Sequence, residues 1–151
     1  MPGSIKDEEQ LSLKLMVVLS KAYKSITDRA LQDIKSHGLS SSEFGIMEVL
    51  YAKGKFPIQQ IGSKILISSG TMTYNIDKLE KRSLLRRVPC SEDRRVVYAE
   101  LTDEGKDLFD RIFPMHSASI HKMLSSITSS QKHEAIALLK KLGKGVHEHD
   151  N

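Results

Sequence analysis

Residues 68–74 bring several hydroxyl side chains together at what the sequence pattern predicts to be the start of a helix. The hydroxyls belong to Ser68, Ser69, Thr71, Thr73 and Tyr74. Free N–H groups at a helix N-terminus attract phosphate, and hydroxyls can contact phosphates or base edges. Small hydroxyls discriminate weakly between bases, so each contact would add only a modest sequence preference. The segment predicts a surface for a DNA groove; the alternative is that Ser68 and Ser69 only cap the helix.

A basic segment follows in the chain, and in it lysine and arginine outnumber aspartate and glutamate. It holds most of the excess behind the formal net charge of +4. Lys78, Arg86 and Arg87 are predicted phosphate contacts, and each would add close to one unit to the salt dependence of binding. Arg94 and Arg95 lie at the tip of a predicted turn, where an arginine can enter the minor groove. The alternative is a solvated, flexible turn.

The elements that would position these side chains follow from the hydrophobic pattern. Apolar residues at three- and four-residue steps predict a long amphipathic helix over residues 8–36, with Gly38 in the position that favours a helix C-terminus. Ser40 and Glu43 form a capping-box pattern, which opens a second helix. Pro57 suits the first turn of a third, short helix.

The fourth predicted helix carries the hydroxyl side chains. We expect it to begin with Ser68 or Ser69 as its cap and to end near Arg82. After it, two β-prone runs at residues 84–88 and 95–101 flank a polar turn, and this arrangement predicts a β hairpin.

Two further helices complete the predicted order. Thr102 is expected to cap a long helix, in which Pro114 would cause a kink or a break. Thr128 and Gln131 form another capping-box pattern, and it opens the last helix.

Length and composition limit the class of protein. With 151 residues, 39% of them hydrophobic and 28% charged, the chain has the composition of one ordinary globular domain. Its single cysteine, Cys90, excludes an intrachain disulfide. The polar N-terminus has no apolar signal core, and no apolar run approaches the roughly 20 residues of a membrane span. We therefore expect a cytoplasmic protein without a membrane partner.

The predicted fold class is mainly α with a small β hairpin. A winged helix-turn-helix over residues 39–101 would be flanked by helices at residues 8–36 and 103–147, all within a single domain over residues 1–151. The outer helices carry more apolar surface than a small central domain could cover. They are therefore expected to be dimerisation helices that bury this surface in a homodimer.

Longer motifs resemble one known family. The most specific are Asp93-Arg94-Arg95 and Leu101-Thr102-Asp103-Glu104-Gly105, supported by residues 76–85. On these motifs the chain resembles the MarR family of bacterial transcriptional regulators over nearly its whole length. Ser83 departs from the pattern, because the family commonly has glycine there. Residues 59–62, 68–74 and 88–90 resemble the Gram-positive MhqR-like branch of that family, which is linked to quinone and catechol stress.

The resemblance implies a function and a mechanism. It implies a homodimeric repressor that binds a pseudo-palindromic operator in double-stranded DNA, with two recognition helices about 34 Å apart. It also implies that Asp93 and Arg95 brace the wing by an ion pair, which makes Arg94 the stronger DNA contact. No cofactor is expected.

The same resemblance implies release from DNA by a small aromatic, phenolic or quinone-like effector. The effector would bind in a crevice between dimer interface and DNA-binding lobe, and it must favour the state that cannot bind DNA. Candidate lining residues are Tyr23, Phe44, Met47, Phe109, Phe113 and His116. The alternative for each of them is an ordinary place in the core.

Other functions remain open at this stage. Cys90 lies among arginines in the sequence, and positive surroundings favour a reactive thiolate, so the chain could be a repressor that senses oxidants or electrophiles. Against this, sensing relatives generally use a cysteine in or before the first helix. The histidine spacing predicts no metal site, and no motif of an enzyme is found. A winged helix used only for protein contacts is the last alternative, and the basic wing argues against it.

Overall fold

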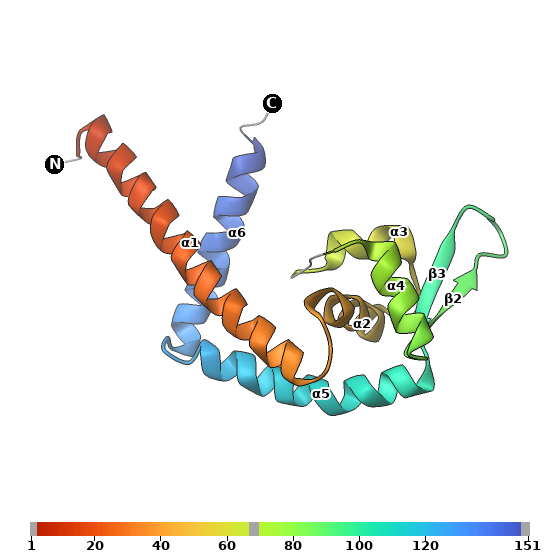
Figure 1. The fold of residues 1–151 in the computed structure, drawn as a ribbon. Coiled ribbons are helices and arrows are strands. Elements are labelled where there is room, and N and C mark those ends of the chain that lie inside the picture. Colours follow the sequence, from red (N-terminus) through yellow and green to blue (C-terminus); the bar gives the residue numbers. More distant parts are fainter. Residues whose placement is uncertain (1–2, 67–69, 149–151) are drawn as a thin grey trace. The chain divides into compact units, whose positions relative to one another are not determined.

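The computed structural model describes residues 3–66 and 70–148. Contacts divide the chain into two compact units, one up to Ser117 and one from Ala118 on. The first unit holds all elements up to the larger part of α5, and the second holds the end of α5 and α6. Figure 1 labels the helices α1 to α6 and the strands β2 and β3. In chain order the elements are α1 (Ile5–Ser36), α2 (Ser41–Lys53), β1 (Phe56–Pro57), α3 (Ile58–Ile61), the 3-10 turn η1 (Gly62–Lys64), α4 (Met72–Lys81), β2 (Leu85–Pro89), β3 (Val97–Leu101), α5 (Asp103–Met123) and α6 (Ser129–Glu148). The predicted fold class, mainly α with a small β element, is confirmed.

Helix α2 forms the centre of the first unit. Its Ile46 and Met47 are fully buried, and so are polar residues of its first turn. A helix that is apolar on every side, rather than along one stripe, belongs in the interior of a domain. Side chains from the surrounding elements complete the core: Ile34, Leu39, Ile61, Ile76, Leu79, Leu84, Leu85, Ala99, Phe109 and Ile112. Helix α4 and the hairpin are therefore mounted on a close-packed support.

Local signals in the sequence correctly predicted several helix ends. At the start of α2, the Glu43 backbone N–H donates to Ser40 Oγ, and the Ser40 N–H donates to Glu43 Oε1, both at 3.1 Å. Thr128 and Gln131 form the same reciprocal pair at the start of α6. After α1, Gly38 has φ +81°, the left-handed conformation that glycine adopts most readily. These boundaries depend on neighbours three residues away and were therefore predictable.

The sheet has one strand more than the predicted hairpin. Its order is β1-β3-β2, with both pairs antiparallel, and Arg87 of β2 lies opposite Ala99 of β3. The extra strand β1 places Phe56 on the other side of Ala99. Pro57 was predicted in the first turn of a helix, whereas it ends β1 and precedes α3. A proline fits this place because an edge strand does not need every backbone N–H.

Helix α5 differs from the prediction at Pro114. It runs from Asp103 to Met123 without a break, although Pro114 lies inside it. Proline removes one backbone hydrogen bond, and the cost can be met by packing. Phe109 and Ile112, just before the proline, are both buried, so the helix is held in place by the core. Of the two predicted outcomes at Pro114, the break is therefore wrong, and the kink stays a prediction.

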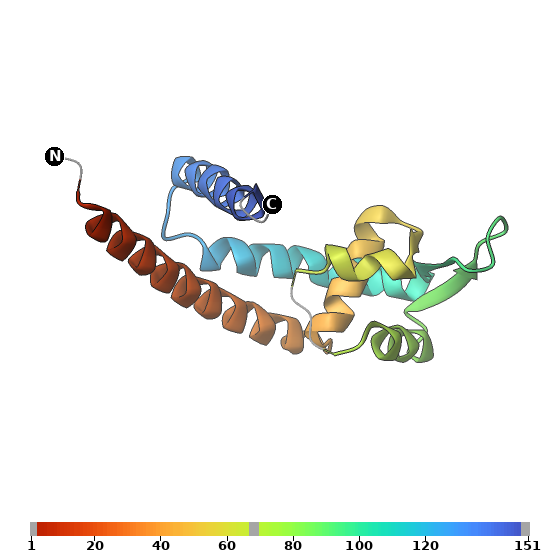
Figure 2. The ribbon, with the colours of Figure 1, turned by 90° about the horizontal axis from the view of Figure 1, so that it is seen from above.

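The outer helices expose many apolar side chains. Helix α1 buries only Ala30 and Ile34, and α6 buries no residue of its described length. Figure 2 shows the amino-terminal half of α1 leading away from α2, α3 and α4. None of the helices within residues 3–66 and 70–148 has the length and apolar character needed to cross a membrane. The exposed apolar residues include Leu11, Leu15, Val18 and Leu19 of α1, and Ile136, Leu139, Leu142 and Val146 of α6.

Ser83 ends α4 in a conformation that suits glycine better. Its φ is +61°, and it is the one non-glycine residue with positive φ in the part of the chain that the structure describes. The Ser83 N–H donates to the Glu80 carbonyl and the Leu84 N–H to the Leu79 carbonyl, each at 3.0 Å. This pair of bonds is the Schellman motif, whose left-handed residue is usually glycine. The departure from the family pattern therefore carries a conformational cost.

Replacing Ser83 by glycine is expected to raise the free energy of unfolding by about 0.5–1 kcal/mol, because glycine adopts positive φ without a Cβ clash. Urea denaturation at one fixed protein concentration measures the change. Ser83→Ala serves as the control, since alanine keeps the clash and removes only an exposed hydroxyl. Equal stability of the two variants would contradict the explanation.

Candidate nucleic-acid interface

Helix α4 starts later than the sequence predicted. It begins at Met72 with Thr71 as N-cap, and Gly70 before it has φ +96°. A residue in this left-handed conformation cannot continue a helix backwards, so the predicted start at Ser68 or Ser69 is wrong. Both serines lie outside the described residues. Asn75, which the sequence analysis did not single out, is buried and donates from Nδ2 to the Thr71 carbonyl at 2.8 Å.

The two faces of α4 have different roles. Ile76 and Leu79 are fully buried, and Met72 packs against the same core. Thr71, Thr73 and Tyr74 are exposed, and Tyr74 is 63% accessible. The first turn of α4 therefore presents three hydroxyl groups to solvent, while the opposite side fixes the helix on the core.

The wing is the loop between β2 and β3, which projects beyond the helices in both ribbon views (Figures 1 and 2). Within it, Arg95 Nε lies 3.2 Å from Asp93 Oδ1, and the Arg95 N–H donates to the same oxygen at 3.0 Å. The guanidinium and then the N–H of Arg95 lower the pKa of Asp93 below its ordinary value of 3.8. The predicted ion pair is present. Arg94 is exposed and has no partner among the described residues.

Two contacts fix the wing to its surroundings. Gln59 of α3 donates from Nε2 to the Arg95 carbonyl at 3.1 Å, which ties the loop to the helix-turn-helix. Across the hairpin, Arg86 Nε lies 2.8 Å from Glu100 Oε1, and the Arg86 side chain is 63% exposed. Arg86 therefore stays accessible to solvent, whereas the wing tip is restrained at its backbone.

Arg87 lies where β2 passes α4. Its Nη2 is 2.6 Å from Asp77 Oδ1, and its Nη1 is 2.7 Å from Glu80 Oε1. The hydrogen bond to Asp77 and the charge of Glu80 raise the pKa of Arg87 against partial burial. Sequence analysis grouped Arg87 with Lys78 and Arg86 as a phosphate contact, and the structure places it in a bridge between two carboxylates.

Glu43 is a buried carboxylate that the sequence analysis recognised only as a helix cap. It is 2% exposed, and Arg82 Nη1 lies 2.9 Å from its Oε2 while Lys78 Nζ lies 3.6 Å from its Oε1. The same Arg82 nitrogen donates to the Gly38 carbonyl at 3.3 Å. Burial would raise the pKa of Glu43, but the hydrogen bonds from Ser40 and Arg82 and the charge of Lys78 together lower it below 4.5. This cluster connects α4, α2 and the turn after α1.

Three of the predicted effector contacts are core residues. Phe44, Met47 and Phe109 are 3%, 0% and 0% exposed. Phe109 is the centre of an aromatic cluster, with ring centroids 5.2 Å from Phe44, 4.9 Å from Tyr51 and 5.6 Å from Phe113. A ligand could reach these rings only where the packing opens, so the alternative of an ordinary core explains their observed position.

His116 joins this cluster to charged groups. Its ring centroid lies 4.5 Å from that of Phe44, and its Nδ1 lies 2.9 Å from Asp33 Oδ2. Burial raises the pKa of Glu48 nearby, and the charge of His116 opposes that effect. Tyr23 is 63% exposed on α1 and takes part in none of the ring contacts within the described residues. The structure thus brings five of the six candidates to one region and leaves Tyr23 apart.

Cys90 is half-buried at the end of the wing loop, with its N–H donating to the Val96 carbonyl. Of the arginines near it in sequence, Arg86, Arg87 and Arg95 are paired with carboxylates, so the expected positive surroundings are largely neutralised. The thiol-sensing alternative is not favoured. Within residues 3–66 and 70–148, no three His, Cys, Asp or Glu side chains form a metal-binding group.

An exposed, hydroxyl-rich helix beside a wing that carries the exposed Arg94 at its tip is typical of a winged helix-turn-helix DNA-binding protein. Residues 39–97 match the MarR family. Over 140 residues the chain is 44% identical to the HTH-type transcriptional regulator MhqR of Bacillus subtilis (strain 168), covering 93% of this chain and 97% of that protein. The chain belongs to the MarR family of DNA-binding transcriptional regulators. The predicted family and its MhqR-like resemblance are confirmed, and the relatives are regulators rather than enzymes.

Solved structures show the same fold. A MarR family regulator from Streptomyces coelicolor in complex with DNA has a TM-score of 0.77 at 21% identity, covering 96% of this chain and 91% of that one. BpsR of Bordetella bronchiseptica, whose DNA binding is regulated by 6-hydroxynicotinic acid, has a TM-score of 0.72 at 22% identity, covering 83% and 90%.

Proposed function

We propose that this protein is a homodimeric repressor that binds a pseudo-palindromic operator and is released by a small aromatic, phenolic or quinone-like effector. One observation carries the proposal: the exposed hydroxyl face of α4 stands beside a wing whose tip arginine, Arg94, has no partner among the described residues. A surface of this kind can contact two grooves at once. Such a protein acts on chromosomal DNA, which places its work in the cytoplasm.

Helix α4 would enter the major groove with its first turn. Thr71, Thr73 and Tyr74 supply hydroxyls there, and Ser68 and Ser69 remain predicted contacts just before the helix. Hydroxyls accept from or donate to several base edges, so selectivity would come from many weak contacts rather than one strong pair.

The wing would enter the adjacent minor groove through Arg94. Its neighbour Arg95 is braced by Asp93, yet its side chain is 91% exposed and can turn toward a phosphate. Lys78 and Arg86 are the proposed phosphate contacts at the base of the interface, because both side chains stay about half exposed or more. Backbone phosphates would fix the register of the lobe, and the grooves would supply selectivity.

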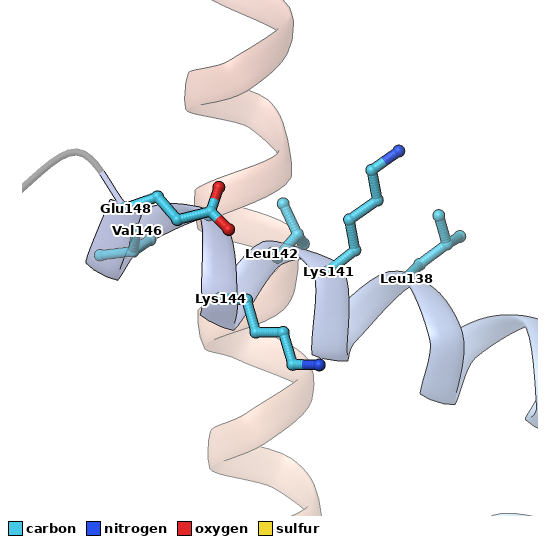
Figure 3. A pocket seen from close by; sticks show the side chains of 7 residues that line it. Leu138, Lys141, Leu142, Lys144, Val146 and Glu148 are labelled. Carbon is cyan, nitrogen blue, oxygen red and sulfur yellow. The ribbon is translucent and has the colours of Figure 1, made fainter.

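The outer helices support the dimer. Figure 3 shows Leu138, Leu142 and Val146 on α6, together with the charged side chains of Lys141, Lys144 and Glu148. The three apolar side chains are exposed, and such apolar surface on a helix often marks a protein–protein contact. The exposed apolar side chains of α1 described above would also be stabilised by burial against another surface. In a two-fold symmetric dimer, a second copy of the chain would bury the apolar faces of α1 and α6. The same symmetry would place the two recognition helices about one DNA turn, ~34 Å, apart.

The effector would act on the aromatic cluster of the first unit. Phe44 of α2 and three residues of α5, Phe109, Phe113 and His116, bring three phenyl rings and one imidazole together, and Asp33 of α1 contacts that imidazole. Aromatic rings favour a flat aromatic guest, and a phenolic oxygen could hydrogen bond to the imidazole. The similarity to MhqR and to BpsR, which responds to a hydroxylated aromatic acid, supports this class of effector. Met47 and Tyr23 remain predicted contacts.

The test is binding of the purified protein to the DNA upstream of its own gene, at several salt concentrations, with and without a quinone. We expect tight binding that weakens steeply with salt and is lost on addition of the quinone. Binding that ignores quinones would remove the effector class and keep the regulator. Absence of binding to that DNA and to any sequence selected from a random pool would overturn the proposal.

In the same assay, Arg94→Ala is expected to weaken binding and to reduce the slope of log K against log salt by about one unit for each wing, because one phosphate-neutralising charge is lost. Arg29→Ala on α1 is the matched control, since it removes the same exposed charge far from the wing in sequence. A slope unchanged by Arg94→Ala would remove the wing from the interface.

A further inference from the structure

Arg87 makes a bridge between the two elements that would contact DNA. Its guanidinium spans two carboxylates of α4, from Nη2 to Asp77 at 2.6 Å and from Nη1 to Glu80 at 2.7 Å. Its own backbone N–H also donates to Glu80 Oε2 at 3.4 Å. Figure 1 shows α4 beside the base of the β2–β3 hairpin, where this bridge lies.

Both ends of the bridge belong to regular elements, and its side chains are 31% exposed at Arg87, 50% at Asp77 and 42% at Glu80. Asp77 and Glu80 are three residues apart, so they lie on one face of the helix. On the other side, Arg87 is paired in the sheet with Ala99, a residue that is fully buried. A planar guanidinium that holds one carboxylate with each terminal nitrogen fixes direction as well as distance, which a lysine ammonium cannot do.

We propose that Arg87 is a positioning residue: it fixes the angle between α4 and the wing, and its charge is not available to a DNA phosphate. A phosphate would have to displace two carboxylates that already lie within 2.7 Å of the guanidinium. The inference rests on the proposed function, because an angle between α4 and wing matters only to a protein that inserts both into DNA. It replaces the phosphate contact that the sequence suggested for Arg87.

The test uses the full chain and two probes: a duplex that the wild-type protein selects from a random-sequence pool, and a scrambled duplex of the same length. The measured quantity is the ratio of the two affinities. Arg87→Lys keeps the positive charge but cannot contact both carboxylates with two fixed nitrogens. We therefore expect the ratio of the two affinities to fall about tenfold. Asp77→Asn combined with Glu80→Gln removes the partners and should lower the ratio in the same way. In Arg87→Lys, which keeps the charge, the salt slope on the scrambled duplex should stay at its wild-type value.

A phosphate contact at Arg87 predicts the opposite pattern. Arg87→Lys would then keep the wild-type ratio of affinities, because a lysine also neutralises a phosphate, and this result overturns the proposal. Arg29→Lys on α1 is the matched control, because it makes the same exchange at an exposed arginine outside the proposed interface, and it should keep the wild-type ratio. If the wild-type protein selects no sequence at all, the proposed function itself fails, which is a distinct outcome.

Discussion

Replacing Arg82 by methionine is expected to lower the free energy of unfolding by about 3 kcal/mol at neutral pH. The variant leaves the carboxylate of Glu43, which is 2% exposed, with Lys78 at 3.6 Å as its remaining cation. Removing one partner of a buried ion pair lowers the free energy of unfolding by more than the intact pair adds to it. The reason is that the remaining charge stays buried, poorly solvated and without that partner. Urea denaturation at fixed protein concentration measures the loss.

The loss should depend on pH in a defined direction. In the wild-type protein the pKa of Glu43 is lowered from 4.5, so its contribution to stability is present above about pH 4.5 and disappears as the pH falls through the lower folded value. Without Arg82 the pKa of Glu43 moves upward, and protonation relieves the buried charge. The difference between variant and wild type should therefore shrink as the pH falls from 7 toward 4.

Arg86→Met is the matched control for this experiment. Its partner Glu100 is on the surface of the hairpin, with side chains 63% and 29% exposed, so the loss should stay below about 1 kcal/mol. Adding Glu43→Gln to Arg82→Met should recover part of the stability at pH 7. A loss for Arg82→Met that is as small as the control, or that grows toward low pH, would show that Glu43 is not a buried charge.

Replacing Gly105 by alanine is the second change with a large expected effect. A Cβ at this position would lie 2.0 Å from the Leu84 carbonyl oxygen, which also accepts from the Thr102 N–H at 3.1 Å. The Leu84 carbonyl is part of the backbone and cannot rotate away as a side chain can. An added Cβ would therefore push α5 away from Leu84 and the start of β2. We expect a loss of about 2–3 kcal/mol in the free energy of unfolding.

Gly143→Ala on α6 is the control for Gly105, because an added methyl there meets no described atom within 4 Å. Alanine is the better helix former, so this variant should gain up to about 1 kcal/mol. Chemical denaturation of both variants at one protein concentration gives the comparison. If Gly105→Ala is as stable toward unfolding as Gly143→Ala, the close approach of Gly105 to Leu84 is contradicted.

Local patterns in the sequence predicted a large part of the fold. The capping boxes at Ser40 and Thr128, the glycine after α1 and the β2–β3 hairpin depend on residues close together in the chain, and all are present. Strand β1 was missed because a two-residue strand has no periodicity, and it exists only because Phe56 meets Ala99. The start of α4 was predicted too early because serine is a common helix cap, whereas the positive φ of Gly70 delays the helix until Met72 and has no signature in the local pattern.

The candidate interface was predictable in its composition and not in its pairing. Hydroxyls on α4 and arginines near the wing are visible in the sequence, and so is the Asp93–Arg95 pair through the family pattern. By contrast, Arg82 reaches Glu43 across 39 positions of the chain, and no local rule brings them together. An arginine that could bind DNA, judged from the sequence, can instead pair with a carboxylate of the same chain. The structure is therefore needed to tell the arginines that pair within the chain from those that stay accessible.

Both edge strands of the short sheet, β1 and β2, are poorly suited to pairing with a further strand. Strand β1 has two residues and ends in Pro57, while β2 ends in Pro89 and carries Arg86 and Arg87. Short length, proline and charge are the features that stop an edge from templating another strand. The hairpins of neighbouring molecules are therefore poor templates for a growing β ribbon, even when the protein is concentrated.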